Sequence, residues 1–250
     1  MNGNWSWNTF LESIPYIVKG IPITIGLTIA CFLVALIFGF VWVINSYIPL
    51  NFIKKPVQFL RMFIYSTPPL VQLFFLFYAL PMVPVIGVTL NPYVCAVLGL
   101  GIHYSTYIGE IYRSGIESVD KGQWEAATAL NFSKRDKWIK IIFPQAIPPT
   151  IPMLGNYLII MFKEVPITAI IGVVGILSLA NSFGALNFAY LEPLTVVGII
   201  FLVLSVPASI LVNKIESKIN NKDLFAVKNK KKNSDEKLKD LSAERSNQVV

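Results

Sequence analysis

The sequence predicts an all-α membrane protein with five transmembrane helices. Its 250 residues are 54% hydrophobic and only 14% charged, whereas a soluble domain usually carries about 25% charged residues. The mean hydropathy is +0.61. The charges are also clustered, because none occurs between Lys19 and Lys54 or between Arg61 and Glu110. These observations exclude a soluble enzyme, a disulfide-stapled domain and a disordered chain.

Each predicted span is an apolar segment long enough to cross about 30 Å of hydrocarbon, which takes roughly 20 helical residues. The spans are expected at about 20–45, 57–80, 92–113, 149–172 and 192–213. Between the second and third spans, the segment 81–92 holds three prolines and a glycine and therefore predicts a hairpin. The segment 177–190 is apolar but short, and it predicts a re-entrant or interfacial turn on the outer side.

The basic residues orient these spans. Nineteen of the 21 lysines and arginines fall in the segments 46–61, 113–148 and 214–250. The positive-inside rule places these three segments in the cytoplasm, so the N-terminus is expected outside and the C-terminus inside. The net charge of +7 is mostly this cytoplasmic excess and needs no nucleic-acid partner. Residues 216–250 are predicted to be a disordered, lysine-rich cytoplasmic tail near anionic lipid headgroups.

The cysteines and the histidine predict no metal site and no disulfide. Cys31 and Cys95 both lie in apolar runs, where a cysteine behaves as a small buried residue. His103 is the single histidine of the chain, which leaves little room for a multi-histidine metal centre.

The longest internal loop, 113–148, has the pattern of two short helices. Residues 123–130 are strong helix formers, and Asn131 follows them at a position suited to a left-handed helix end. Ser133 and Asp136 have the spacing of a helix-start cap, which predicts a second helix over 134–143 that ends near Pro144. The residues alone favour equally an amphipathic hairpin on the membrane and a docking element for a cytoplasmic partner.

The sequence GQWEAATALNFSKRDKWIKIIFPQAIPPTIPMLGNYLIIMFKEVPITAIIG resembles the EAA loop and following helix of ATP-binding-cassette (ABC) importer permeases, in particular the polar amino-acid branch. Residues 125–127 match the EAA tripeptide, Asn131 stands where the family has glycine, and Phe143 stands where it has leucine before proline. The segments 65–81 and 106–127 also agree with the family. The resemblance covers about residues 10–215.

This resemblance implies the type I ABC importer transmembrane-domain fold over residues 1–215, with a coupling loop at about 114–148. It also implies three protein partners: a dimer of ABC ATPase subunits, a second permease subunit that is identical or homologous, and an extracellular solute-binding protein. The residues that it assigns to ATPase coupling are Glu125, Ala126, Ala127, Asn131 and Pro144.

The resemblance further implies that this chain is not itself an enzyme. No G-x-x-x-x-G-K-[ST] phosphate loop occurs in it, so ATP and magnesium are expected in the partner ATPase and no cofactor in this chain. The expected location is the bacterial cytoplasmic membrane, and the expected substrate is a polar amino acid. The opening NWSWNTFLESIPYIVKGIPITI is similar to cystine-type permeases, which makes cystine a candidate.

Two sets of polar residues inside the predicted spans are candidates for the substrate pathway. Lys163 and Glu164 fall within the fourth span, where a charged side chain is costly unless it faces protein or water. They either line the pathway or form a structural ion pair. Thr67 and Gln72 flank the two prolines that kink the second span, and they either satisfy neighbouring backbone groups or touch substrate. Glu110 and Arg113 predict an ion pair on one helix face.

Two other functional classes compete with the ABC permease. A self-sufficient secondary transporter would need internal repeats, but the chain has five predicted spans and no second copy of the EAA or TPPLVQLFF segments. A membrane scaffold with a partner-binding loop would leave the intramembrane charges without a role.

Overall fold

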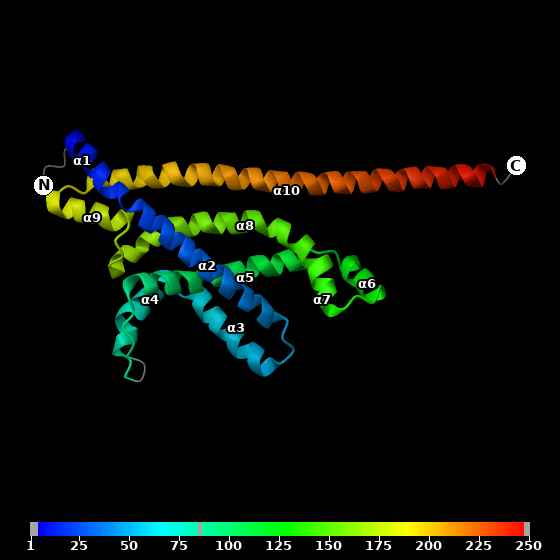
Figure 1. Ribbon diagram of the computed structural model, residues 1–250, viewed down its shortest axis with the longest axis horizontal. Helices are drawn as coiled ribbons and strands as arrows, with labels where there is room; N and C mark the ends of the chain where they lie inside the picture. Colours follow the sequence, from blue (N-terminus) through cyan, green and yellow to red (C-terminus); the bar gives the residue numbers. More distant parts are fainter. Residues whose placement is uncertain (1–4, 85–86, 248–250) are drawn as a thin grey trace.

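The computed structural model describes residues 5–84 and 87–247, and the side chains among them up to residue 219. The described chain is helical, with four helical stretches long and apolar enough to cross a membrane and a fifth formed by a bent pair (Figure 1). The four are α2 (Ile21–Ser46), α5 (Pro92–Glu117), the stretch Lys134–Ile171 and the apolar part of α10 (Leu191–Asn247). The predicted all-α class is confirmed, and α2, α5 and the apolar part of α10 lie where the first, third and fifth spans are predicted.

The centre of the molecule is the contact between α2 and α5. Cys31, Ala35, Leu100 and Ile108 are fully buried in the cluster that the two helices form with Met161 and its neighbours. The helices approach closely because Gly101 has no side chain: a Cβ there would lie 2.7 Å from Val34 Cγ1. Both cysteines are free and buried, as predicted.

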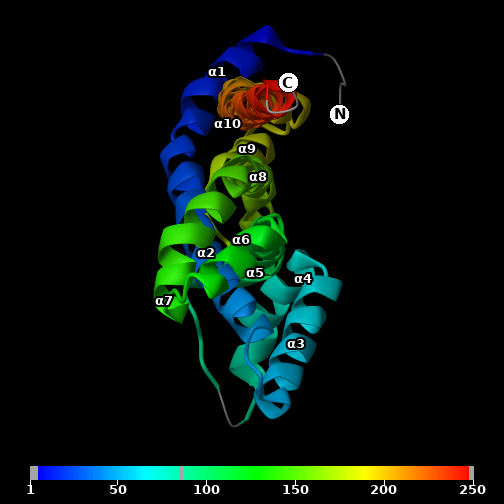
Figure 2. The ribbon, with the colours of Figure 1, turned by 90° about the vertical axis from the view of Figure 1, so that its right-hand side faces the viewer.

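The second predicted span is two helices rather than one kinked helix. α3 (Asn51–Ser66) and the group α4 (Pro69–Phe74), η1 (Phe75–Ala79) and η2 (Leu80–Met82) meet at an angle of 106°. The break falls at Thr67 and Pro68, which are extended. Pro68 and Pro69 cannot donate hydrogen bonds to carbonyls of the preceding turn, so the helix cannot continue. Both views place α3 and α4 on the side of the bundle opposite α10 (Figures 1 and 2).

The fourth span begins much earlier than predicted. The helical stretch comprises α7 (Lys134–Asp136), the π-helix η3 (Lys137–Ile142), α8 (Phe143–Glu164) and the 3-10 helix η4 (Val165–Ile171). The expectation that the loop helix ends near Pro144 is therefore wrong. The Phe143 N–H bonds the Trp138 carbonyl five residues back, and such π turns let a helix accommodate a proline without ending.

Two short helices cover the end of the bundle that holds the N-terminus. α1 (Trp7–Val18) is not predicted by the sequence, and α9 (Ile176–Asn187) is a helix where a turn is predicted. Ile17 of α1, Ile176 and Ala180 of α9, and Val196 of α10 form one buried cluster. The buried Glu192 carboxylate accepts the Ser6 N–H at 2.9 Å, which ties the start of α1 to α10.

The backbone of α10 is helical to Asn247, whereas the sequence predicts a disordered tail from residue 216. Pro and Gly are absent between 216 and 247, and Lys, Glu, Leu and Ala recur there. These residues have good intrinsic helix propensity. The expected position of this tail, in the cytoplasm near anionic lipid headgroups, stays a prediction from its sequence.

Candidate functional site

The loop between α5 and α8 has a defined hinge at Asn131. α6 (Lys121–Ala129) is capped at its start by Asp120, whose carboxylate accepts the Gly122 N–H at 2.7 Å. Asn131 has φ 57°, the left-handed conformation predicted for it. Its N–H donates to the Thr128 carbonyl at 3.0 Å, and the next N–H, of Phe132, donates to the Ala127 carbonyl at 3.1 Å. This pair of bonds is the Schellman motif, which ends α6 with its last carbonyls satisfied.

The second loop helix starts as predicted. The Ser133 hydroxyl accepts the Asp136 N–H at 3.1 Å and donates to the Asp136 carboxylate at 2.7 Å. The Lys137 ammonium donates to the Thr128 hydroxyl at 2.7 Å, which links the second helix to α6 across the hinge. The angle between the two helices is thus held by side chains on both sides of Asn131.

An aromatic and aliphatic cluster attaches the loop to the transmembrane core. Trp138 stacks edge-on against both Trp124 of α6, at 5.2 Å between ring centroids, and Tyr47 at the end of α2, at 5.6 Å. Ile142 is fully buried in the same cluster with Val43 of α2 and Ile116 of α5. A displacement of α6 would therefore be transmitted through this cluster to α2, α5 and α8 at the same time.

The predicted coupling residues differ in exposure. Glu125, Ala126 and Pro144 are exposed, whereas Ala127 is only 1% exposed and packs inside the loop. Glu125 and Ala126 are thus available to a partner, and Ala127 supports the loop from within. Along the long axis of the molecule, α6 and α7 lie far from α1 and α9 (Figure 1).

Lys163 and Glu164 lie at the junction of α8 and η4 rather than in the middle of a helix. Lys163 is exposed, and Glu164 is partly buried. Neither forms an ion pair with any side chain that the structure describes. The sequence leaves open whether these two residues line the pathway or form a structural ion pair, and both alternatives stay predictions for the assembled transporter.

Thr67 and Gln72 satisfy the backbone at the break between α3 and α4. Pro68 leaves the Ile64 carbonyl without its helical donor, and the Gln72 amide donates to this carbonyl at 2.7 Å. The same amide donates to the Thr67 hydroxyl at 2.7 Å, and that hydroxyl donates to the Phe63 carbonyl at 3.0 Å. In this structure both side chains therefore satisfy neighbouring backbone groups, which is one of the two roles that the sequence leaves open for them; contact with substrate is the other.

The predicted pair between Glu110 and Arg113 belongs to a larger network. Arg113 donates to Glu110 at 2.5 Å and to Glu117 at 3.2 Å, all on α5. Arg61 of α3 also pairs with Glu110, a contact between distant segments that spacing along one helix could not reveal. The network joins α3 to α5, and its side chains are 35% to 59% exposed, so its contribution to stability is modest.

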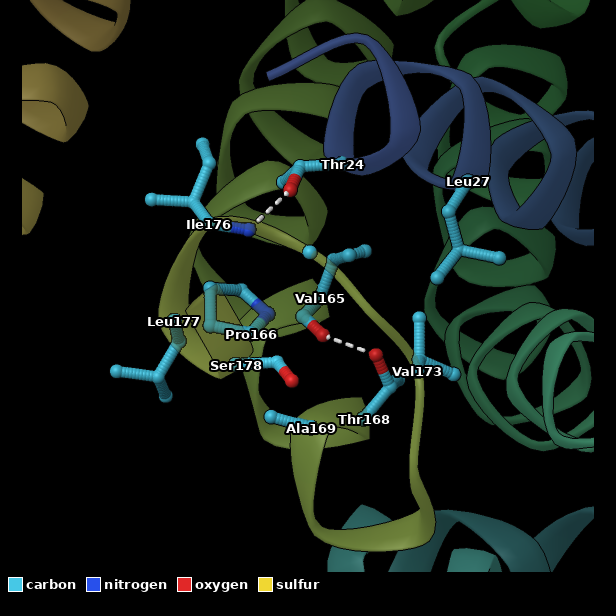
Figure 3. Close-up of a pocket in the computed structure, with 11 residues that line it drawn as sticks. Thr24, Leu27, Val165, Pro166, Thr168, Ala169, Val173, Ile176, Leu177 and Ser178 are labelled. Atoms are coloured by element: carbon cyan, nitrogen blue, oxygen red, sulfur yellow. Dashed lines mark hydrogen bonds between the residues drawn. The ribbon is translucent and has the colours of Figure 1, made fainter. Parts of the chain in front are cut away.

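Near the other end of the bundle, η4 and α9 border two hollows. Figure 3 shows the smaller one, where Thr24 of α2 points at the first turn of α9. Its hydroxyl accepts the Ile176 N–H at 3.1 Å. The larger hollow, of about 630 Å³, lies between η4, α9 and Leu70 of α4, and the residues of α9 that line it include Ser178, Asn181 and Ser182. No candidate from the sequence lies in this second hollow.

Comparison with known proteins supports the fold and identifies the family. Residues 48–221 match the family described as "Binding-protein-dependent transport system inner membrane component". A probable amino-acid ABC transporter permease protein of Sinorhizobium fredii, y4tG, is 37% identical over 86% of this chain and 91% of its own length. The arginine transport system permease protein ArtQ of Bacillus subtilis is 30% identical over 88% of this chain and 100% of its own.

A solved structure supports the same architecture. The crystal structure of an amino acid ABC transporter with histidines matches with a TM-score of 0.80 and 28% identity. The match covers 86% of this chain and 99% of that one.

Proposed function

Because this chain belongs to the family of inner membrane components of binding-protein-dependent transport systems, among the amino-acid ABC transporter permeases, we propose that it imports a polar amino acid across the bacterial cytoplasmic membrane. Its energy comes from a dimer of separate ATPase subunits. A second permease subunit completes the membrane channel, and an extracellular solute-binding protein delivers the amino acid. ATP and magnesium are held by the ATPase, and this chain carries no cofactor of its own.

The observation that carries this proposal is the unbroken helical stretch from Lys134 to Ile171. One end of the stretch is fixed to α6 through the Asn131 hinge and the Trp138 contacts. The other end carries Lys163 and Glu164 and then forms a wall of the larger hollow. A push on α6 when the ATPase dimer closes would shift this stretch as one body, since a packed helix moves as a unit rather than bending continuously.

Orientation follows from the same assignment. The loop that receives the ATPase must lie in the cytoplasm, and this agrees with the concentration of basic residues in 113–148. The hairpin 81–92, α1 and α9 are then at the outer surface, where the binding protein docks. Lys163 and Glu164, where α8 passes into η4, are then proposed to face the substrate pathway.

The substrate is expected to be a polar amino acid, with cystine as one candidate from the opening residues. ArtQ, named for arginine, is 30% identical, and transport proteins of one fold differ in substrate through a few side chains. The choice is best made by measuring which amino acids bind the cognate binding protein.

Uptake by proteoliposomes tests the proposal against its rivals. The permease is reconstituted with its ATPase and binding protein, and uptake of radiolabelled L-arginine and L-cystine is measured with ATP, without ATP, and without the ATPase subunit. Import of at least one of them only when ATP and ATPase are both present is the expected result. Uptake driven by an ion gradient without the ATPase would instead identify a secondary transporter. The absence of uptake under every condition, with a panel of polar amino acids, would favour a scaffold.

A further inference from the structure

α9 has one polar face and one apolar face. Ser178, Asn181, Ser182 and Ala185 follow the spacing i, i+3, i+4 and i+7, which places them on one side of the helix. All four line the larger hollow. The residues of η4 that line the same hollow, Pro166, Ile167, Ala169 and Ile170, are by contrast apolar.

The opposite face of α9 is anchored and cannot rotate freely. Ile176 and Ala180 are almost fully buried, and Phe183 is 8% exposed. The Ile176 N–H is also held by the Thr24 hydroxyl of α2 (Figure 3). Burial of one face together with this hydrogen bond fixes the direction in which Ser178, Asn181 and Ser182 point.

The hollow in front of this polar face lies beside one interrupted helix. Leu70 follows the break between α3 and α4, and Pro166, Ile167, Ala169 and Ile170 belong to η4, the 3-10 helix in which the stretch Lys134–Ile171 ends. Interrupted helices in transporters occur where the chain lines a cavity rather than lipid. The volume of about 630 Å³ exceeds what an amino acid needs, and the hollow is open to the surface.

The side chains that line the larger hollow determine which substrate groups it can bind. Among the described residues that line it, the polar groups are hydroxyls and one amide, and no carboxylate, ammonium or guanidinium is present. Hydroxyls and amides both donate and accept hydrogen bonds, so they can satisfy a carboxylate and an ammonium in turn. The Ser182 hydroxyl already donates to the Ser178 carbonyl at 2.9 Å and is therefore available to accept from an ammonium. A charged substrate side chain would find no opposite charge here, so this surface does not select for one.

We propose that the polar face of α9, formed by Ser178, Asn181 and Ser182, is a contact surface for the amino acid on the outer part of its route. It hydrogen-bonds the zwitterionic α-amino and α-carboxylate groups that every substrate of this class shares. Selection by side-chain charge is left to other residues. This inference rests on the proposed import function and adds a place and a chemistry to it.

Cysteine labelling in the assembled transporter tests the surface. Cys31 and Cys95 are fully buried, so a membrane-impermeant methanethiosulfonate reagent should leave the parent complex unaffected. Asn181→Cys is the test variant, and Ser182→Cys serves as a second, nearly isosteric one. Two controls lie on the same helix: Ala180→Cys on the buried face, and Leu186→Cys, which is 74% exposed and outside the hollow.

The expected result has three parts. Asn181→Cys and Ser182→Cys react from outside, and their labelled complexes lose uptake by about tenfold or more while basal ATPase activity persists. Leu186→Cys reacts without loss of uptake, and Ala180→Cys does not react. Full uptake by the labelled Asn181→Cys and Ser182→Cys complexes would overturn the proposal. It would also be overturned if neither cysteine reacted in the assembled complex, because the face would then be covered by another subunit.

These outcomes stay separate from the import function itself. The unlabelled complexes must first show ATP-dependent uptake of L-arginine or L-cystine, whichever the parent complex imports. If the parent complex shows no such uptake, the proposed function fails before the labelling step.

Discussion

Asn131 is the residue on which the shape of the coupling loop depends most directly. Its positive φ of 57° closes the Schellman motif of α6. A β-branched residue in this conformation costs roughly 1–2 kcal/mol, because its Cβ approaches the following carbonyl. We therefore expect Asn131→Val to redirect α6 and to lower ATP-dependent uptake strongly.

The matched variant is Asn131→Gly, since glycine adopts the left-handed conformation without strain. It should keep uptake close to that of the parent protein and keep the ATPase bound during purification. Equal uptake by the valine and glycine variants would mean that this hinge does not control coupling.

Substitutions at Ala126 and at Ala127 are expected to have different effects, one on ATPase docking and the other on the stability of the loop. The resemblance to the EAA loop assigns both alanines to ATPase coupling, so a bulky side chain at either position could be expected to block the ATPase. Ala127 is only 1% exposed, so a tryptophan there would instead overpack the loop and lower the yield of folded permease. The exposed Ala126 is the appropriate position, and Ala126→Trp should release the ATPase while the permease stays folded.

Copurification of the ATPase and the elution profile of the permease measure these two effects. Leu186→Trp places the same large side chain on an exposed site at the other end of the molecule and should leave the complex intact. If Ala126→Trp kept its ATPase and transported normally, the loop would not be the docking site.

Lys163 and Glu164 are the last two residues of α8, directly before η4. Since neither has an ion-pair partner among the described side chains, we expect their charges to act on the substrate or on the second permease subunit. Lys163→Met or Glu164→Gln should lower uptake by about tenfold or more, with assembly and basal ATPase activity retained.

Lys19→Met removes one exposed positive charge at the end of α1 and should have little effect on uptake. Normal uptake by both neutral variants at 163 and 164 would remove these residues from the pathway. A fall in the yield of folded complex with Glu164→Gln would indicate a structural role between subunits.

At the scale of elements, one hydrogen bond joins α2 to α9. The Thr24 hydroxyl accepts the buried Ile176 N–H. Thr24→Val keeps the shape of the side chain but leaves this donor unsatisfied, which costs about 1–3 kcal/mol. We expect the apparent Tm of the purified complex to fall by about 2–10 °C.

Thr28 supplies the control one turn further along α2. It is also buried, but its hydroxyl only donates to the Thr24 carbonyl within the same helix. Thr28→Val should therefore change the Tm much less than Thr24→Val. Similar shifts for both variants would mean that α9 is held by packing alone.

The sequence predicts best the features that depend on a few neighbouring residues. The Ser133 cap and the left-handed conformation of Asn131 depend only on local geometry. The apolar segments of α2 and α5 are long enough to be recognised as membrane spans. The course of the chain at prolines is different. The break at Pro68 is much sharper than a kink, while the helix continues through Pro144, because the outcome depends on whether a π turn or a side-chain donor such as Gln72 accommodates the proline.

Short helices at the outer end are also hard to predict. α1 and α9 are each 12 residues long and owe their stability to the cluster around Ile17, Ile176 and Val196, which brings distant segments together. The polar spacing on α9 is visible in the sequence, but only its packing shows that it faces a hollow. The contact of Arg61 with Glu110 likewise depends on how α3 meets α5.

At the scale of the whole molecule, the two ends of the bundle have different constructions. The end that holds α6 is tied to the core by the tight cluster of Trp138, Ile142 and Val43. The other end holds the hollow between η4 and α9. The stretch Lys134–Ile171 connects the two ends, so movement at the loop can be transmitted across the membrane only if these ends lie on opposite sides of it.

Cysteine labelling of intact cells checks this requirement. Gly87 has φ +49°, where an added side chain is strained, so the neighbouring Val88, 44% exposed in the hairpin 81–92, is the better position. Val88→Cys should react with an impermeant maleimide added outside. Lys232→Cys, in the lysine-rich tail, should react only after the cells are permeabilised, since basic segments stay in the cytoplasm. The buried Cys31 and Cys95 should contribute no background. The reverse pattern would place the loop outside, where no ATPase could reach it, and would contradict both the topology and the coupling mechanism.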